Sequence, residues 1–126
     1  MIVKKILIVE DDEKSLYLAR FILEKEGYDV IEARDGLEAL DKISKETPAL
    51  ILMDMQLPRL DGYEATRRIK ADEKLSKVPV IALTAYAMKG DREKTIDAGC
   101  SGHIEKPINP ATFAEYIKKF LEVTAL

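Results

Sequence analysis

The 126-residue sequence has few of the features that mark extracellular or membrane proteins. It contains a single cysteine, Cys100, so no intramolecular disulfide can form and a reducing compartment is expected. No apolar run approaches the ~20 residues of a membrane span. The apolar start of the chain, residues 1–9, is too short for a signal peptide and is followed at once by acids. These absences predict a cytoplasmic protein with no membrane segment.

Clustered positive charge is also absent. Lysine and arginine total 20 against 23 acids, which gives a net charge of −3, and the basic residues form no block. A nucleic-acid partner is therefore not expected. No internal repeat or low-complexity linker interrupts the chain, and its length and its hydrophobic share of 47% are those of one globular domain. We therefore expect a single domain over residues 1–126.

Five short aliphatic segments alternate with five amphipathic ones. The expected strands are Lys5–Val9, Asp29–Ala33, Leu50–Asp54, Val80–Leu83 and Gly102–Glu105. The first expected helix runs from about Glu13 to Glu26, the second follows Asp35 and the third opens at Asp61. The fourth runs from about Lys89 to Ala98, and the last is entered through Asn109-Pro110, as N-cap and first helical residue. Several strands are apolar on both faces, which is typical of strands covered by helices on both sides. Strict alternation with short connections predicts an α/β fold with a doubly wound parallel sheet.

The helical spacing of apolar residues predicts which side chains face the core. The expected inward residues are Leu16, Ala19, Ile22 and Leu23 in the first helix, Ala39, Leu40 and Ile43 in the second, and Ile117, Phe120 and Leu121 in the last. Glycines at positions 27 and 99 are placed to end the first and fourth helices. Asp61 with Glu64 three residues later has the spacing of a capping box.

Polar residues stand at the expected strand ends, where a doubly wound sheet binds its ligands. These are Glu10, Asp11 and Asp12 after the first strand, Asp54 at the end of the third, Thr84 after the fourth and Lys106 after the fifth. With strand order 2-1-3-4-5, Asp11 and Asp54 lie on adjacent strands and can reach one cation. Carboxylates packed together need a cation or protons to offset their repulsion, and hard oxygen ligands suit Mg²⁺. For Asp12 the alternative is a cap for the helix that follows.

The same set of residues suits phosphoryl transfer, which depends on positioning and charge neutralisation. A carboxylate nucleophile such as Asp54 would form an aspartyl phosphate. Lys106 can neutralise phosphate charge, and Thr84 can donate a hydrogen bond to a phosphoryl oxygen.

Four sequence motifs resemble the response-regulator receiver family, the CheY-like domains of two-component signalling. They are residues 6–13 (ILIVEDDE), residues 52–58 (LMDMQLP) with Asp61-Gly62 following, residues 82–85 (ALTA), and Lys106-Pro107. The resemblance covers nearly the whole chain. It implies a flavodoxin-like (βα)₅ fold and a phosphoacceptor rather than an enzyme. It also implies Mg²⁺ dependence, a histidine kinase or histidine phosphotransfer protein as phosphodonor, and a downstream protein target.

By position, the resemblance assigns roles to individual residues of this sequence. Asp54 is implied to be the phosphoacceptor, Asp11 a direct Mg²⁺ ligand, Glu10 a ligand through water and Gln56 a ligand through its backbone carbonyl. Thr84 and Lys106 are implied to bind the phosphoryl group. The Lys106-Pro107 bond is implied to be cis, which is plausible only before proline.

One position departs from the family pattern. His103 stands three residues before the lysine, where the family usually has Tyr or Phe. In the family, Thr84 moves towards the phosphoryl group and the aromatic ring turns inward to fill the space. Imidazole is smaller, polar and titratable, so the inward state is expected to be weaker or to carry a hydrogen bond. We expect His103 to be a partly buried switch residue, the alternative being a phosphodonor or metal ligand.

Two functions from other classes compete with the receiver interpretation. An aspartate-nucleophile phosphatase of the haloacid dehalogenase type usually has a second Asp two residues after the nucleophile, where this chain has Gln56, which cannot donate a proton in that way. A flavin or nucleotide carrier of flavodoxin architecture needs a phosphate-binding loop after the first strand, where this chain has acids that would repel phosphate. Both are therefore disfavoured.

Within the receiver family, a finer resemblance leaves two forms open. Residues 84–91 (TAYAMKGD), with Gly99-Cys100 and residues 106–108 (KPI), are similar to stand-alone receivers of the DivK type and to receivers attached to hybrid histidine kinases. We expect a free-standing receiver that is a monomer or weak dimer. The alternative is a receiver taken from a hybrid kinase or a longer response regulator.

Overall fold

Five parallel strands form one sheet in the computed structural model, which describes residues 3–85 and 89–124. The strands are β1 (Lys5–Val9), β2 (Asp29–Ala33), β3 (Leu50–Asp54), β4 (Val80–Thr84) and β5 (Gly102–Glu105). Their order is β2-β1-β3-β4-β5, and every neighbouring pair is parallel. The predicted fold class and strand order are therefore confirmed. The fourth strand includes Thr84, one residue beyond its predicted end.

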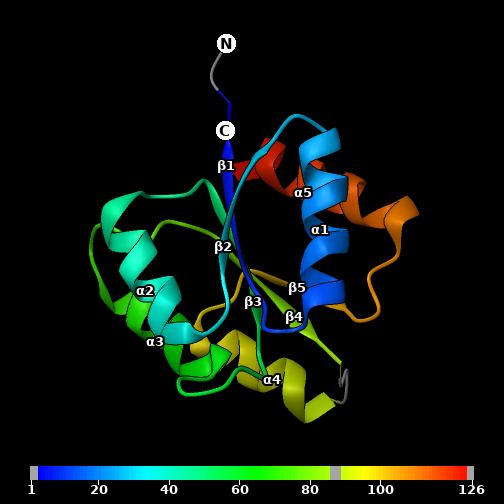
Figure 1. The fold of residues 1–126 in the computed structure, drawn as a ribbon. Helices are drawn as coiled ribbons and strands as arrows, with labels where there is room; N and C mark the ends of the chain where they lie inside the picture. Colours follow the sequence, from blue (N-terminus) through cyan, green and yellow to red (C-terminus); the bar gives the residue numbers. More distant parts are fainter. Residues whose placement is uncertain (1–2, 86–88, 125–126) are drawn as a thin grey trace.

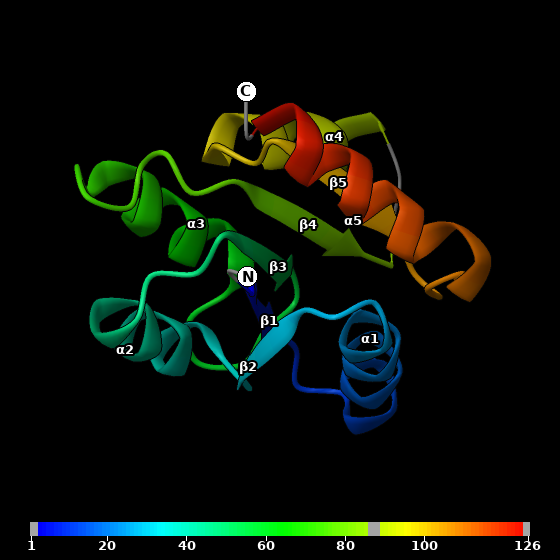
Figure 2. The ribbon, with the colours of Figure 1, turned by 90° about the horizontal axis from the view of Figure 1, so that it is seen from above.

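Helices cover both faces of the sheet (Figure 1). They are α1 (Glu13–Lys25), α2 (Gly36–Lys45), α3 (Gly62–Ala71), α4 (Lys89–Ala98) and α5 (Pro110–Thr124). The view from above shows α1 and α5 on one side of the strands and α2 and α3 on the other (Figure 2). Helix α4 lies beside α3 (Figure 1). Gly27 and Gly99 follow α1 and α4 with φ of 93° and 109°, a conformation that glycine adopts readily. Residues 86–88, part of the DivK-like segment, lie outside the described residues.

An aspartate caps each of the first three helices at the carboxyl edge of the sheet. Asp12, Asp35 and Asp61 each accept a hydrogen bond from a backbone N–H three residues later, at 3.0, 2.9 and 2.9 Å. These bonds satisfy N–H groups that have no partner within the helix. Asp12 therefore caps α1, as the alternative interpretation of this residue predicted.

The core consists of two apolar layers, one on each face of the sheet. One layer joins α1 and α5 to the strands, and the other joins α2 and α3 to them. Most of the predicted inward residues are buried, but Leu40 and Phe120 are only partly buried. Phe113 of α5 was not predicted, yet it is among the largest fully buried side chains.

Cys100 follows α4 and packs against the layer beneath α2 and α3. Burial raises the pKa of its thiol from 9.0 to about 11, although a hydrogen bond with Thr66 and the charge of Lys70 act in the opposite direction. The thiol is therefore protonated at neutral pH.

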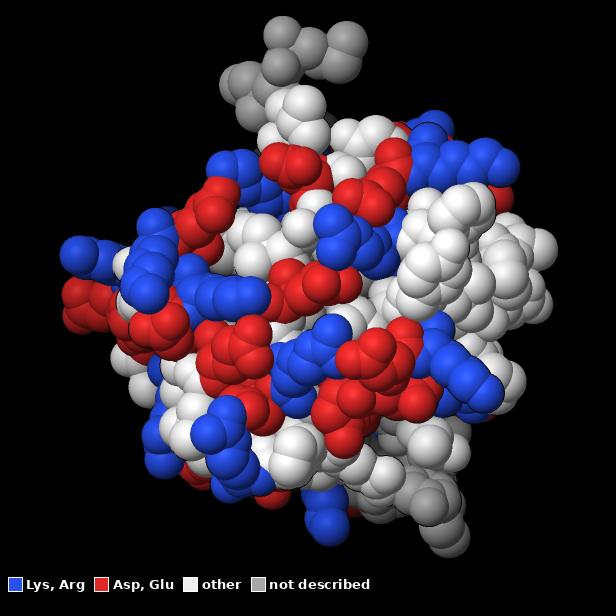
Figure 3. All heavy atoms as spheres, viewed as in Figure 1, with Lys and Arg blue, Asp and Glu red and all other residues white. Residues whose placement is uncertain are grey.

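The surface carries interspersed charges of both signs on the face seen in Figure 3. Arg20, for example, pairs with Glu24 and Glu32, and Arg34 pairs with Glu13. Exposed pairs of this kind contribute little stability individually. No helix within the described ranges is long and apolar enough to cross a membrane.

The burial of Phe113 gives a first testable prediction. Phe113→Ala should lower the free energy of unfolding by about 3–5 kcal/mol, because it removes a large buried ring and leaves a cavity. Urea titration followed by circular dichroism measures this change. The matched control is Phe21→Ala, because Phe21 is 54% exposed, and its loss should stay below about 1 kcal/mol. Equal losses in the two variants would contradict the position of Phe113 in the core.

Candidate functional site

Asp54 closes the central strand β3, whose five residues are all buried. Its side chain is also buried, and its two carboxylate oxygens have different partners. Oδ1 accepts a hydrogen bond from the backbone N–H of Gln56 at 2.9 Å, and Oδ2 accepts one from Nζ of Lys106 at 3.1 Å. Because charged hydrogen bonds are short and directional, the carboxylate is held in one orientation.

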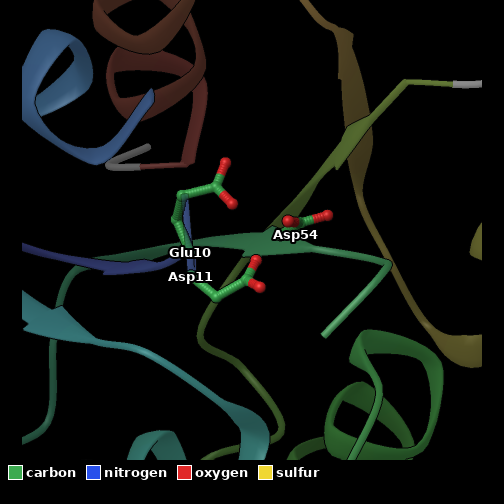
Figure 4. Close-up of side chains that lie close together, drawn as sticks. All are labelled: Glu10, Asp11 and Asp54. Carbon is green, nitrogen blue, oxygen red and sulfur yellow. The ribbon is translucent and has the colours of Figure 1, made fainter. Parts of the chain in front are cut away.

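Two more acids follow the neighbouring strand. The register of β1 against β3 pairs Val9 with Met53, so the residues just after each lie side by side. Carboxylate oxygens of Glu10, Asp11 and Asp54 all lie within 4.8 Å of one another. Figure 4 shows these three side chains gathered at the ends of β1 and β3. The predicted convergence of acids at this edge is confirmed, with Glu10 buried and Asp11 exposed.

Lys106 approaches the acids from the other side, directly after β5. Its Nζ contacts Oε1 of Glu10 and lies 3.1 Å from Oδ2 of Asp54. Its backbone N–H donates to the carbonyl of Thr84 at 2.8 Å, and its peptide bond to Pro107 is cis. Burial acts to lower the pKa of Lys106, but the hydrogen bonds and charges of Glu10 and Asp54 outweigh it and the pKa is raised. The ammonium group therefore stays charged.

Glu10 is a buried acid whose charged form is disfavoured. Burial raises its pKa from 4.5 to about 7; a hydrogen bond with Asp54 adds to the rise, and Lys106 partly offsets it. Its Oε1 faces Lys106 as an ion pair, yet it receives no hydrogen bond of good geometry from the described residues. A buried carboxyl group with this pKa, beside two other acids, is one that a cation would help to ionise.

The donor set at this edge fits a hard divalent cation such as Mg²⁺. Carboxylate oxygens are its preferred protein ligands, and it keeps several waters when it binds to proteins. Asp11 is exposed, so a cation at the cluster would be open to water on that side. The buried Oε1 of Glu10, which lacks a hydrogen bond among the described residues, agrees with this fit.

The remaining predicted residues are not part of the acidic cluster. Thr84 ends β4 with its side chain buried, and Gln56 contributes its backbone N–H while its side chain is exposed. His103 lies within β5 opposite Ala82, three residues before Lys106. It is partly buried and borders a pocket of about 270 Å³, which Tyr116 of α5 also lines.

Sequence reasoning also missed an ion pair between two loops beside the site. Arg59, in the loop between β3 and α3, donates from Nε to Oδ2 of Asp35 at 3.0 Å. Asp35 was predicted only as the residue that precedes the second helix. No spacing rule connects two residues from different loops, so the sequence contains no signal for this pair.

Known proteins resemble this chain over nearly its whole length. The response regulator receiver domain profile matches residues 6–118. The polar-differentiation response regulator DivK of Brucella ovis is 49% identical over 118 residues, which are 94% of this chain and 96% of that protein. DivK of Brucella anthropi is 48% identical over the same shares.

Solved structures agree with these sequence relatives. A CheY-like receiver domain protein of Methanospirillum hungatei is 35% identical, with a TM-score of 0.90 over 98% of each chain. The receiver domain of a sensor histidine kinase of Pseudomonas aeruginosa is 37% identical, with a TM-score of 0.88 over 96% of this chain and 99% of that one. That structure has a magnesium ion coordinated in its active-site cleft. The chain described here therefore belongs to the response regulator receiver family, the phosphoacceptor domains of two-component signalling.

Proposed function

We propose that Asp54 accepts a phosphoryl group and that the chain relays this event as a change in partner binding. The observation that supports this role is the position of Asp54, whose carboxylate lies beside those of Glu10 and Asp11 and pairs with Lys106. A histidine kinase or a histidine phosphotransfer protein is the phosphodonor, and a downstream protein reads the phosphorylated state. The chain acts as a phosphoacceptor rather than as an enzyme with a separate substrate.

In the proposed reaction, a carboxylate oxygen of Asp54 attacks the phosphorus of a phosphohistidine. The new O–P bond forms as the P–N bond breaks, and the imidazole leaves with the electron pair and takes up a proton. The ammonium group of Lys106 already lies against Asp54, so it can shift to the added phosphoryl oxygens and offset their charge. Thr84, at the end of the adjacent strand, supplies a hydroxyl donor to the same group.

Mg²⁺ is the cofactor that we propose for this site. When bound, it would neutralise negative charge on the carboxylates and on the phosphoryl oxygens. Asp11 and Asp54 would hold it directly, Glu10 through a water molecule and Gln56 through its backbone carbonyl. Two observations support this proposal: the three carboxylates lie together, and a receiver relative has magnesium in its cleft.

Thr84 and His103 are the residues that we propose to pass the signal away from the site. The backbone of Thr84 accepts a hydrogen bond from that of Lys106, and His103 lies three residues earlier on the strand that leads to Lys106. Phosphoryl capture would bias this face, formed by α4, β5 and α5, by binding one of its two arrangements more tightly. The pocket beside His103 is a place where such a shift would alter the surface.

We further propose that residues 1–126 act as one receiver domain in the cytoplasm, as a monomer or weak dimer. The DivK relatives, which match over most of their own length, support a free-standing form. A receiver within a longer response regulator or a hybrid kinase is the second form. Its support is the structural likeness to the receiver of a sensor histidine kinase.

The first test of the proposed function concerns the acceptor. Incubation with acetyl phosphate and Mg²⁺ should add one phosphoryl group to the wild-type chain, as measured by intact mass spectrometry. Asp54→Asn should abolish this mass increase, because an amide oxygen is a poor nucleophile. The control is Asp61→Asn, which changes an acid at the same edge and keeps a good helix cap. Labelling that persists in Asp54→Asn would place the acceptor elsewhere.

A second test concerns the metal. Asp11→Asn should raise the melting temperature without metal, because it relieves repulsion between carboxylates, and it should weaken the Mg²⁺-dependent gain. The wild type should gain about 2.7 kcal/mol when Mg²⁺ is at about 100 times its dissociation constant. Asp12→Asn is the matched control, because it removes the neighbouring charge and preserves the cap of α1. An unchanged Mg²⁺ effect in Asp11→Asn would exclude this residue as a ligand.

A third test uses the raised pKa of Glu10. Because its folded-state pKa of about 7 lies above 4.5, the folded chain binds this proton more tightly than the unfolded chain does. The resulting stability is complete below the unfolded-state pKa and is lost as the pH rises through about 7. Glu10→Gln should therefore become increasingly more stable than the wild type, in metal-free buffer, as the pH rises from about 5 to about 8.

Urea titrations at both pH values measure this difference. The exposed Glu73 provides the control variant, Glu73→Gln, whose stability relative to the wild type should show no comparable trend. A pH-independent difference between Glu10→Gln and the wild type would show that the proton on Glu10 is not linked to folding in this range.

A further inference from the structure

The loop between β3 and α3 contains a strained turn. The N–H of Leu60 donates to the carbonyl of Pro58 at 2.7 Å, which closes a three-residue turn around Arg59. Arg59 has φ of 63°, and it is the only non-glycine with a positive φ among the described residues. A three-residue turn with a positive central φ is the rare, strained form of γ-turn, and arginine lacks the freedom of glycine there. Contacts outside the turn must therefore hold Arg59 in place.

Asp35 supplies those contacts. Its Oδ2 accepts a hydrogen bond from Nε of Arg59 at 3.0 Å and also contacts Nη2, while its Oδ1 accepts from the backbone N–H of Glu38 at 2.9 Å. The side chain of Asp35 is only 9% exposed, although that of Arg59 is 63% exposed. The Glu38 N–H and then Arg59 lower the pKa of Asp35, so the carboxylate stays charged. One aspartate therefore both caps α2 and holds the neighbouring loop.

Two glycines fix the loop on its other sides. A Cβ at Gly36 would collide with the carbonyl oxygen of Leu60, so the start of α2 lies directly against the loop. A Cβ at Gly62 would collide with the backbone of Asp54, and the N–H of Gly62 donates to the carbonyl of Met55 at 3.3 Å. The loop is therefore packed between α2 and the backbone of the proposed acceptor.

We propose that Arg59 and Asp35 are positioning residues for the phosphoacceptor site. Their ion pair holds the β3–α3 loop so that Gln56, three residues before Arg59, stays against Asp54. The backbone N–H of Gln56 binds Oδ1 of Asp54 at 2.9 Å, and a loop that relaxed at Arg59 would release this contact. The pair thereby controls metal affinity and phosphoryl uptake, although neither residue is part of the acidic cluster. This inference rests on the proposed role of Asp54.

Three variants test the pair with little damage to the fold. Asp35→Asn removes the charge and retains a residue that caps a helix equally well. Arg59→Gly removes the ion pair, and because glycine has more backbone freedom than arginine, nothing then restricts the loop to one conformation. The third variant combines both changes. Urea titration should show only small changes in stability, so that altered metal binding cannot be attributed to unfolding.

The readouts are Mg²⁺ affinity by calorimetry and the rate of labelling by acetyl phosphate at saturating Mg²⁺. Each single variant should bind Mg²⁺ about fivefold more weakly and label more slowly. The double variant should bind Mg²⁺ no more weakly, and label no more slowly, than the more impaired of the two single variants, because both substitutions remove the same interaction. Arg34→Gln is the matched control, since it breaks the ion pair with Glu13 at the same edge and should leave both readouts unchanged.

The outcomes separate this inference from the proposed function. A wild-type chain that neither binds Mg²⁺ nor gains a phosphoryl group would refute the proposed function itself. If the wild type does both, and Asp35→Asn and Arg59→Gly match it, only the positioning role is wrong. Additive losses of Mg²⁺ affinity in the double variant would also overturn the positioning role, because the two residues would then act independently. An equal loss in Arg34→Gln would overturn it as well, because the effect would not be specific to the ion pair of Arg59 with Asp35.

Discussion

Repulsion between carboxylates at the ends of β1 and β3 is the constraint on which the rest of this site depends. Two buried strands deliver Glu10, Asp11 and Asp54 to one place, and each added negative charge makes the next more costly. In the structure, two effects offset this cost. Lys106 reaches the cluster from beyond β5, and Glu10 binds protons more tightly than an ordinary glutamate. A divalent cation would offset the same repulsion. Metal binding, the protonation of Glu10 and the position of Lys106 are therefore linked.

The sequence predicts the fold well because its signals are local. Apolar runs bounded by turn residues identify all five strands, and aspartates at helix starts identify the caps. The strand order then brings the acids together, because parallel strands present their carboxyl ends at one edge. Phe113 could also have been found, since it lies one helical turn before Ile117 and two before Leu121. That stripe faces the core and leaves Phe120 partly buried at its border.

Other features of the site depend on contacts between distant segments, which no local pattern encodes. The ion pair of Lys106 with Glu10 joins opposite ends of the chain, and that of Arg59 with Asp35 joins two loops. The raised pKa of Glu10 follows from its burial in the folded chain, and the sequence shows only that it is one acid among several. Family membership decides between the receiver and the two rival functions, since the same alternation of strands and helices also serves carriers and phosphatases.

The environment of Cys100 has a practical consequence for spectroscopy. A thiol with a pKa of about 11 is almost entirely protonated near neutrality, and only the thiolate reacts readily with maleimides or methanethiosulfonates. Cys100 should therefore react with such reagents more slowly than a cysteine on an exposed helix face. A cysteine introduced on an exposed helix face would therefore carry a fluorophore or spin label in preference to Cys100. Distance measurements between such labels could follow the domain in solution while its interior stays unaltered.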